Sequence, residues 1–239
     1  MDEMIDKSQI KDIAKNAFAY LQSIDGKIAK DELDCAVETY IFEAIQKITK
    51  QVRIVSEEYG NLLVGEERKQ TIVVDPIDGT GNLIRGIPIY SVAIALLDGD
   101  LTKATVHDIQ YSVVVSTFGI YEASQDDETK KQDIGELSAK EALVRCIRPF
   151  RLRMLGASTV ELCLMAAGSI DGFVEIKGLK SVDLIPVLLI LEKSGCHFSD
   201  KFGNPLEFGL MNPKDNCFSI IAARDKKLLA ELVEAIKEE

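Results

Sequence analysis

Hydrophobic residues recur at helical spacing near the start of the chain. Apolar side chains fall three or four positions apart between Ile10 and Leu21, and again between Val37 and Ile48. On an α-helix this spacing places the apolar side chains on one face, which then packs against a core. We therefore expect two amphipathic helices in the first fifty residues.

Between residues 52 and 118 the pattern changes to short runs rich in β-branched and aromatic residues, which are typical of strands. The short polar pieces Asp98-Gly99-Asp100 and Gln110-Tyr111 predict tight connections between strands of an antiparallel meander. The expected strands are residues 52–56, 71–75, 90–97, 105–109 and 112–118.

The second half of the chain begins with a polar, charged segment at 124–139, which predicts an exposed loop between two lobes. Downstream, short apolar runs alternate with helical runs that end at Gly168 and Gly195. The chain is therefore expected to be an α/β protein, an α+β sandwich of helix and sheet layers, with lobes 1–135 and 136–239 and the active site between them. The elements expected in the second half are strands at 152–155, 172–176 and 219–222, and helices at 159–167, 184–194 and 226–237.

Composition narrows the functional class. The 239 residues are 46% hydrophobic and 28% charged, as in ordinary globular chains. A net charge of −11 argues against a nucleic-acid partner, because that binding depends on Lys and Arg at phosphates. The five cysteines are scattered and form no CxxC pair, which predicts reduced thiols in a cytoplasmic chain. The charged N-terminus is unlike a signal peptide, and the lack of a long apolar run predicts no membrane partner. With only two histidines in the sequence, a histidine-based zinc site or catalytic triad is not expected.

The segment 71–86, TIVVDPIDGTGNLIRG, carries the main candidate chemistry. Asp75 ends an apolar run and Asp78 follows across a proline turn, so two carboxylates can converge on one divalent cation or bridge two. The glycines that follow can expose backbone N–H groups to a phosphate. An isolated DPxD motif is explained equally well as a turn. Here, however, Glu57 also ends a β-type run, and Asp183 precedes a helical run, where its alternative role is a helix N-cap.

These motifs resemble those of the inositol monophosphatase family. The resemblance rests on SEE at 56–58, DPIDGT at 75–80 and VDLIPVLLILEKSG at 182–195, and it extends over nearly the whole chain. It is greatest for the short members that hydrolyse both inositol monophosphate and fructose 1,6-bisphosphate. The resemblance implies the layered fold of that family, Mg²⁺-dependent hydrolysis of a small sugar or polyol phosphate by a metal-activated water, and a homodimer.

The resemblance also implies roles for individual residues. The implied ligands of two Mg²⁺ ions are Glu57, Asp75 as the bridging residue, the carbonyl of Ile77, Asp78 and Asp183, with a third, weaker ion near Glu57. The implied catalytic residues are Glu57, Asp78, Thr80 and Asp34, of which Thr80, hydrogen-bonded to Asp34, orients and helps to deprotonate the attacking water. The implied substrate-binding residues are Asp78, Gly79, Thr80, Ala157, Ser158, Glu175, Lys177 and Lys180. The two lysines, for a second phosphate, are explained equally well as surface charges.

The sequence departs from the family pattern around the third motif and in the first lobe. Val182 stands where Trp usually precedes the Asp, and Ile185-Pro186 replaces small residues. A proline in the first helical turn is compatible with a helix, because its missing N–H has no intrahelical partner there. Asp31 replaces a Thr before Asp34, and the segment 23–33 is short, which leaves the third metal open.

Two alternative functions remain open at this point. A 3′-phosphoadenosine 5′-phosphate phosphatase of the same superfamily would be expected to carry an adenine-binding insertion or an aromatic platform. A catalytically silent metal-binding member would be expected to lack one of the key side chains, and all are present. Dinucleotide binding is excluded because Ile84 stands where GxGxxG requires its third glycine.

Overall fold

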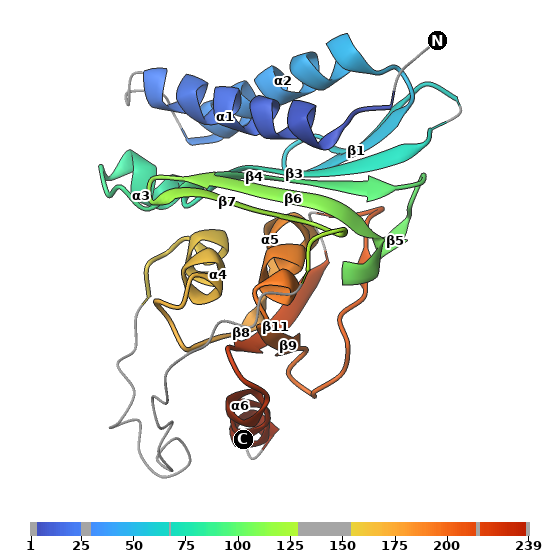
Figure 1. Ribbon diagram of the computed structural model, residues 1–239. Coiled ribbons are helices and arrows are strands. Elements are labelled where there is room, and N and C mark those ends of the chain that lie inside the picture. Colours follow the sequence, from blue (N-terminus) through green and yellow to red (C-terminus); the bar gives the residue numbers. More distant parts are fainter. Residues whose placement is uncertain (1–3, 25–29, 67, 129–153, 214–215, 238–239) are drawn as a thin grey trace.

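The computed structural model describes residues 4–24, 30–66, 68–128, 154–213 and 216–237. Figure 1 shows alternating layers: a helix pair, a six-stranded sheet, a second helix pair, a three-stranded sheet and a final helix. The predicted layering of helices and sheets is confirmed. The predicted lobe boundary at 135–136 lies outside the described residues.

The first helix pair covers one face of the six-stranded sheet. Helix α1 (Lys7–Ser23) begins with a capping box, in which the Asp6 carboxylate accepts from the Gln9 backbone N–H and the Gln9 side chain accepts from the Asp6 N–H. Helix α2 (Lys30–Ile48) packs beside it. The predicted apolar face of α1 is buried, comprising Ile10, Ile13, Ala14, Ala17, Phe18 and Leu21.

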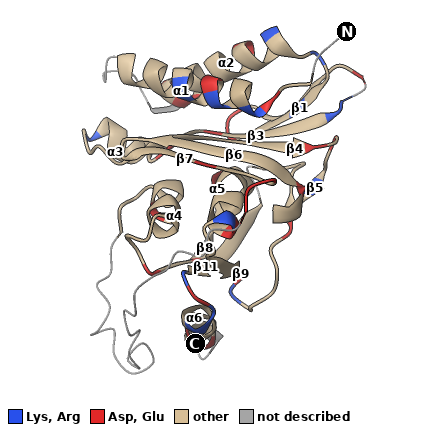
Figure 2. Ribbon diagram, viewed as in Figure 1, with Lys and Arg blue, Asp and Glu red and all other residues tan. Residues whose placement is uncertain are grey.

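The central sheet has the strand order β2-β1-β3-β4-β6-β7. Strands β1 and β3 are parallel, and the other neighbouring strands are antiparallel. Helices cover both faces, so its inner strands read as nearly continuous apolar runs, and Figure 2 shows them mostly tan. The strands are β1 (Val52–Ser56), β2 (Gly60–Val64), β3 (Gln70–Asp78), β4 (Ser91–Asp98), β6 (Ile109–Ser116) and β7 (Gly119–Ser124).

The second helix pair lies between the two sheets (Figure 1). Helix α5 packs against strands of both sheets, which explains why its sequence is apolar almost all round. Among the described residues, no helix is long and apolar enough to cross a membrane. The elements below the central sheet are α4 (Ser158–Ala166), α5 (Ser181–Lys193), the three-stranded sheet β8 (Gly172–Lys180), β11 (Cys217–Ala223) and β9 (His197–Ser199), and α6 (Lys226–Lys237).

Two predicted features between β4 and β6 are wrong. The residues expected as a strand at 105–109 form mainly a 3₁₀ helix, η1 (Val106–Asp108). The Asp108 carboxylate accepts from the Thr105 N–H at 2.7 Å and so ends the extended backbone. The Gln110-Tyr111 pair, expected to be a turn, lies inside β6. Strands β2, β7, β9, β5 (Lys103–Ala104) and β10 (Phe208–Gly209) were not expected.

The start of α5 also differs from the prediction. The helix begins at Ser181, three residues before the expected start at Leu184, so Pro186 lies inside it rather than in its first turn. Proline at this depth removes the backbone N–H that would bond to the carbonyl of Val182. Most of the strand expected at 152–155, and residues 129–139 of the expected loop, lie outside the described residues. The described end of that strand, at 154–155, is not in a strand.

Candidate metal centre and active site

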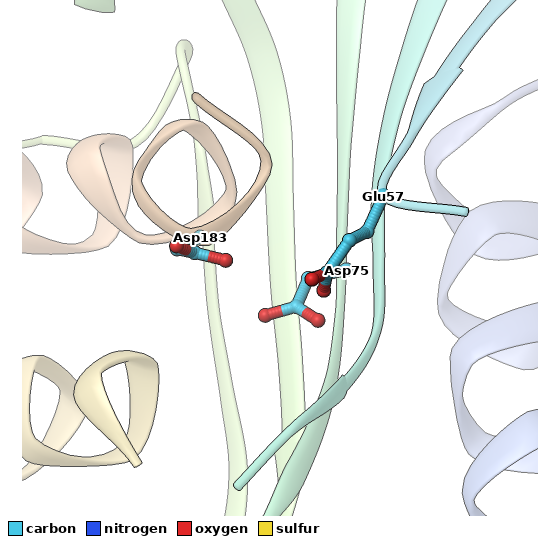
Figure 3. A group of neighbouring side chains, drawn as sticks. All are labelled: Glu57, Asp75 and Asp183. Atoms are coloured by element: carbon cyan, nitrogen blue, oxygen red, sulfur yellow. The ribbon is translucent and has the colours of Figure 1, made fainter. Parts of the chain in front are cut away.

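Three carboxylates from three separate elements meet beside the central sheet. Glu57 follows β1, Asp75 lies in β3, and Asp183 lies in the first turn of α5. Each offers one oxygen atom, and these atoms lie within 4.8 Å of one another. Figure 3 shows the three side chains directed into the same space between the sheet and α5.

The pairing of β1 with β3 explains why Glu57 and Asp75 are neighbours. The two strands are parallel and aligned so that Ser56 is opposite Val74, which puts the next residues, Glu57 and Asp75, side by side. Beyond Asp75 the pairing of β3 with β4 shifts register before Asp78. Pro76 lies in this irregular stretch, where a residue without a backbone N–H disturbs the ladder least.

Asp75 is the most unusual of the three residues. The residue is 1% exposed, and within the described parts of the chain neither carboxylate oxygen has a hydrogen-bond partner. Burial, followed by the charges of Asp183, Asp78 and Glu57, raises its pKa well above the usual range. A buried carboxylate without a partner is unfavourable unless a cation compensates it. The oxygen donors and their convergence fit a hard divalent cation such as Mg²⁺.

Asp78 and Asp183 each accept a hydrogen bond at a helix N-terminus. Asp183 is one of the three converging carboxylates, and the charge of Asp78 lies near Asp75. The Asp78 Oδ2 accepts from the Val160 N–H of α4 at 3.1 Å, and burial raises the pKa of Asp78 to about 7. The Asp183 Oδ2 accepts from the Lys180 N–H at 2.8 Å, and burial raises the pKa of Asp183 to about 6. Asp183 therefore bonds at the start of α5 and also faces Asp75. The alternative role expected for Asp183, a helix N-cap, is wrong, because α5 begins at Ser181 with Lys180 as its N-cap and Asp183 is its third residue.

The hydroxyl of Thr80 lies between two acceptors. Its Oγ1 is 3.0 Å from Asp34 Oδ1, as the resemblance implied, and 3.0 Å from the backbone oxygen of Ile77. All three residues are buried. A hydroxyl has one proton, so Thr80 donates to one of the two acceptors at a time and keeps its lone pairs for another donor.

Gly79 is required by the local geometry. Its φ is +85°, and a Cβ there would lie 2.7 Å from the Ile89 oxygen and 2.9 Å from the Ala157 Cβ. The short helix α3 (Thr80–Ile84) starts directly after it. Asn82 then fastens this helix to the segment before α4, because its Nδ2 donates to the Leu155 oxygen at 2.7 Å.

The substrate residues implied for the second half lie on α4 and β8. Ala157 is the N-cap of α4, is 1% exposed and is followed by Ser158 at the start of that helix. Glu175 lies within β8, opposite Ile220 of β11. Lys180 ends β8, and its Nζ lies 2.5 Å from the Glu57 Oε1. The side chain of Lys177 lies outside the described residues.

Two supporting residues were not expected from the sequence. Glu38 is fully buried and accepts from the N–H groups of Glu58 (3.2 Å) and Tyr59 (3.1 Å), so it holds the turn that follows Glu57. The sequence does carry a signal for Glu38, because its carboxylate falls on the apolar face of α2, where a charged side chain is unusual. Glu161 accepts from the Leu155 N–H at 3.0 Å and so holds the segment before α4. No comparable signal marks Glu161.

Comparisons with known proteins agree with the geometry. The family model described as "Inositol monophosphatase family" matches residues 28–107 and 103–239. The fructose-1,6-bisphosphatase/inositol-1-monophosphatase of Thermococcus kodakarensis is 29% identical over 91% of this chain and 86% of its own length. The enzyme of the same name from Archaeoglobus fulgidus is 30% identical over 85% of this chain and 82% of its own.

A solved structure shows the same fold. It is the MJ0109 gene product, titled inositol monophosphatase–fructose 1,6-bisphosphatase, with a TM-score of 0.79 and 22% identity. The match covers 97% of this chain and all of that chain (100%). The predicted family is therefore confirmed, and the relatives' names support the predicted class of enzyme, a phosphoric monoester hydrolase. Since the family model spans nearly the whole sequence, the chain belongs to the inositol monophosphatase family.

Proposed function

We propose that this chain hydrolyses a small sugar or polyol phosphate, such as inositol 1-phosphate or fructose 1,6-bisphosphate, in a Mg²⁺-dependent reaction with water. The observation that carries the proposal is Asp75, which is buried without a hydrogen-bond partner in the described structure and faces Glu57 and Asp183. Folding alone would not favour two carboxylates that converge on a third, buried and unpaired one, so a cation at this position accounts for the arrangement.

The chain offers ligands for two Mg²⁺ ions, or for three if a weaker ion binds near Glu57. The residues that would hold them are Glu57, Asp75, Asp78, Asp183 and, through its carbonyl, Ile77. Bound Mg²⁺ would lower the pKa of a water molecule and neutralise charge on the phosphate oxygens. The protein's own part is to keep these donors close together and largely out of water, which the parallel β1–β3 pairing and the start of α5 support.

Thr80 and Asp34 would orient the attacking water. When Thr80 donates to Asp34, its oxygen still accepts a hydrogen bond, and the water would be its donor. Asp34 would then receive the proton that passes through the hydroxyl. Both side chains are buried, so the water has few alternative partners there.

The substrate would lie against the start of two helices. The N–H groups of Gly79 and Thr80 would bind the phosphate, and Asp78, Ala157, Ser158 and Glu175 would bind the polyol. Lys177 and Lys180 would bind a second phosphate. Changing both lysines to alanine should then impair cleavage of fructose 1,6-bisphosphate more than that of inositol 1-phosphate, and equal losses on both substrates would refute this role.

The test of the proposed function is phosphate release from inositol 1-phosphate, fructose 1,6-bisphosphate and 3′-phosphoadenosine 5′-phosphate, each with Mg²⁺ and with EDTA. Mg²⁺-dependent release from the first two supports the proposal. Preference for the nucleotide would make the chain a nucleotide phosphatase instead. Absence of release from all three, with a folded protein that binds Mg²⁺, would favour a silent metal-binding member.

The homodimer and the cytoplasmic location expected from the sequence stay proposals. Sedimentation equilibrium of the purified protein would test the first, with a mass of twice 26.4 kDa as the expected result. Fractionation of the source cells would test the second.

A further inference from the structure

The Lys180 ammonium contacts the cluster of three carboxylates formed by Glu57, Asp75 and Asp183. Lys180 is the last residue of β8, and its Nζ lies 2.5 Å from the Glu57 Oε1, an ion pair between residues 123 positions apart. Its side chain is 32% exposed and that of Glu57 is 29% exposed, so the pair is partly shielded from solvent. Asp183 and Glu58 add negative charge around the same ammonium.

The position of this ammonium conflicts with a divalent cation at Glu57. Two positive charges a few ångströms apart repel each other strongly, and more so where solvent is partly excluded. Glu57 therefore satisfies its charge either with Lys180 or with a metal ion. In the structure the ammonium pairs with Glu57, while both oxygens of Asp75 have no partner among the described residues.

The Lys180 ammonium can move away from Glu57 while the Lys180 backbone keeps its position. The Lys180 N–H donates to the Asp183 Oδ2 at 2.8 Å, which fixes the backbone at the start of α5. The ammonium is carried on a flexible four-carbon stem, whose rotamers can change without moving that backbone. An ammonium that leaves Glu57 stays within reach of the space in front of the carboxylates.

We propose that Lys180 is a displaceable internal cation: it pairs with Glu57 in the metal-free protein, competes with Mg²⁺ for that carboxylate, and is released to the anionic substrate when the ion binds. This inference rests on the proposed metal site at Glu57, Asp75 and Asp183. It makes Lys180 a positioning residue that lowers metal affinity in the absence of substrate. It also couples metal loading to the binding of phosphate.

The test measures metal binding without catalysis. Mg²⁺ or Mn²⁺ is titrated into EDTA-stripped, dialysed protein by calorimetry, with no substrate present. Lys180→Met should bind the ion more tightly than the wild type by about tenfold, which corresponds to about 1.4 kcal/mol. Lys180→Arg keeps the charge and should keep the weaker affinity. Inorganic phosphate should bind the metal-loaded Lys180→Met protein more weakly than it binds the loaded wild type.

The control variant is Lys103→Met, which removes the same charge from an exposed ion pair with Glu207 at a 2.7 Å separation. It should bind the metal as the wild type does, because Lys103 pairs with Glu207 rather than with one of the three carboxylates, and an exposed charge is screened by salt. Lys180→Gln replaces Lys180→Met if the latter does not give a cooperative melting transition in EDTA.

Three outcomes would overturn the inference. Unchanged metal affinity in Lys180→Met would show that Lys180 does not compete, and weaker affinity would show that it supports the site. Equal tightening in Lys103→Met would show a general effect of net charge. The proposed function fails separately, because it requires the wild type itself to bind the ion and to release phosphate.

Discussion

Replacing Asp75 by asparagine should separate stability from function at this site. Asp75 is 1% exposed, has no hydrogen-bond partner for either oxygen in the described structure, and is surrounded by the charges of Asp183, Asp78 and Glu57. Asparagine has nearly the same size but no charge, and its amide can donate to the neighbouring carboxylates. In EDTA we therefore expect Asp75→Asn to be more stable than the wild type.

The expected size follows from the cost of an unsatisfied buried group. Removing that cost is worth about 2 kcal/mol, within the range for buried polar atoms without partners. For a chain of this length, 1 kcal/mol shifts the melting temperature by about 2–4 °C, so the variant should melt about 4–8 °C higher in EDTA. Saturating Mg²⁺ should reverse the order, because an ion at about 100 times its Kd adds about 2.7 kcal/mol to the protein that binds it.

The assay is thermal unfolding of both proteins in EDTA and in Mg²⁺, together with phosphate release. Asp75→Asn should lose nearly all turnover while it keeps a cooperative transition. The matched control is Asp171→Asn, at an aspartate whose side chain is 77% exposed, which should change stability by no more than about 0.5 kcal/mol. The reasoning is refuted if Asp75→Asn melts below the wild type in EDTA, or if Mg²⁺ stabilises both proteins equally.

Three further predictions concern the surroundings of the proposed metal site. Thr80→Ala should lower kcat by about a hundredfold with little change in KM, since it removes the hydroxyl that would orient the water, and Thr80→Ser should recover most of the loss; an effect confined to KM would contradict this role. In EDTA the melting temperature should fall from about pH 5 to about pH 8, because the folded protein still holds protons on Asp78 (pKa about 7) and Asp183 (pKa about 6) that the unfolded chain loses near 3.8. A melting temperature that rises over this interval would show that the sign is wrong. Glu38→Gln should raise the Mg²⁺ concentration for half-maximal activity several-fold, because a neutral amide accepts the two hydrogen bonds from the turn after Glu57 more weakly than a carboxylate does. An unchanged Mg²⁺ titration would exclude this role.

The sequence predicted the parts of the fold that depend on local patterns. The apolar face of α1 and the limits of β1 are found as expected, because periodicity and β-branched runs determine them directly. Strand β2 was missed because its side chains are only partly buried and its apolar pattern is weak. The residues of η1 look like a strand by composition, but the hydrogen bond that the Thr105 N–H donates to the Asp108 carboxylate competes with extended backbone.

Local pattern explains the position of Glu57 and Asp75, whereas Asp183 precedes a helical run and the contact of Thr80 with Asp34 was implied by the family resemblance. Glu57 and Asp75 follow apolar runs, so their convergence needed one further step, the parallel pairing of β1 with β3. The partner of Lys180 was not predictable in this way. Its ion pair with Glu57 joins the end of β8 to the turn after β1, and no local pattern encodes a contact over 123 positions.

The residues that break local folding rules gather at the carboxylates. Asp75 interrupts a buried strand, Glu38 interrupts the apolar face of α2, and Pro186 lies inside α5 one turn after Asp183. Replacing any of these three residues by an ordinary apolar or helix-forming residue would make the local structure more stable. Such positions in an otherwise consistent sequence are expected at functional sites, where stability is given up for chemistry. The positions of Asp75 beside Glu57 and Asp183, and of Glu38 at the turn after Glu57, therefore support the proposed metal site on grounds other than the family resemblance. They also explain why the most informative variant is one that should stabilise the metal-free protein.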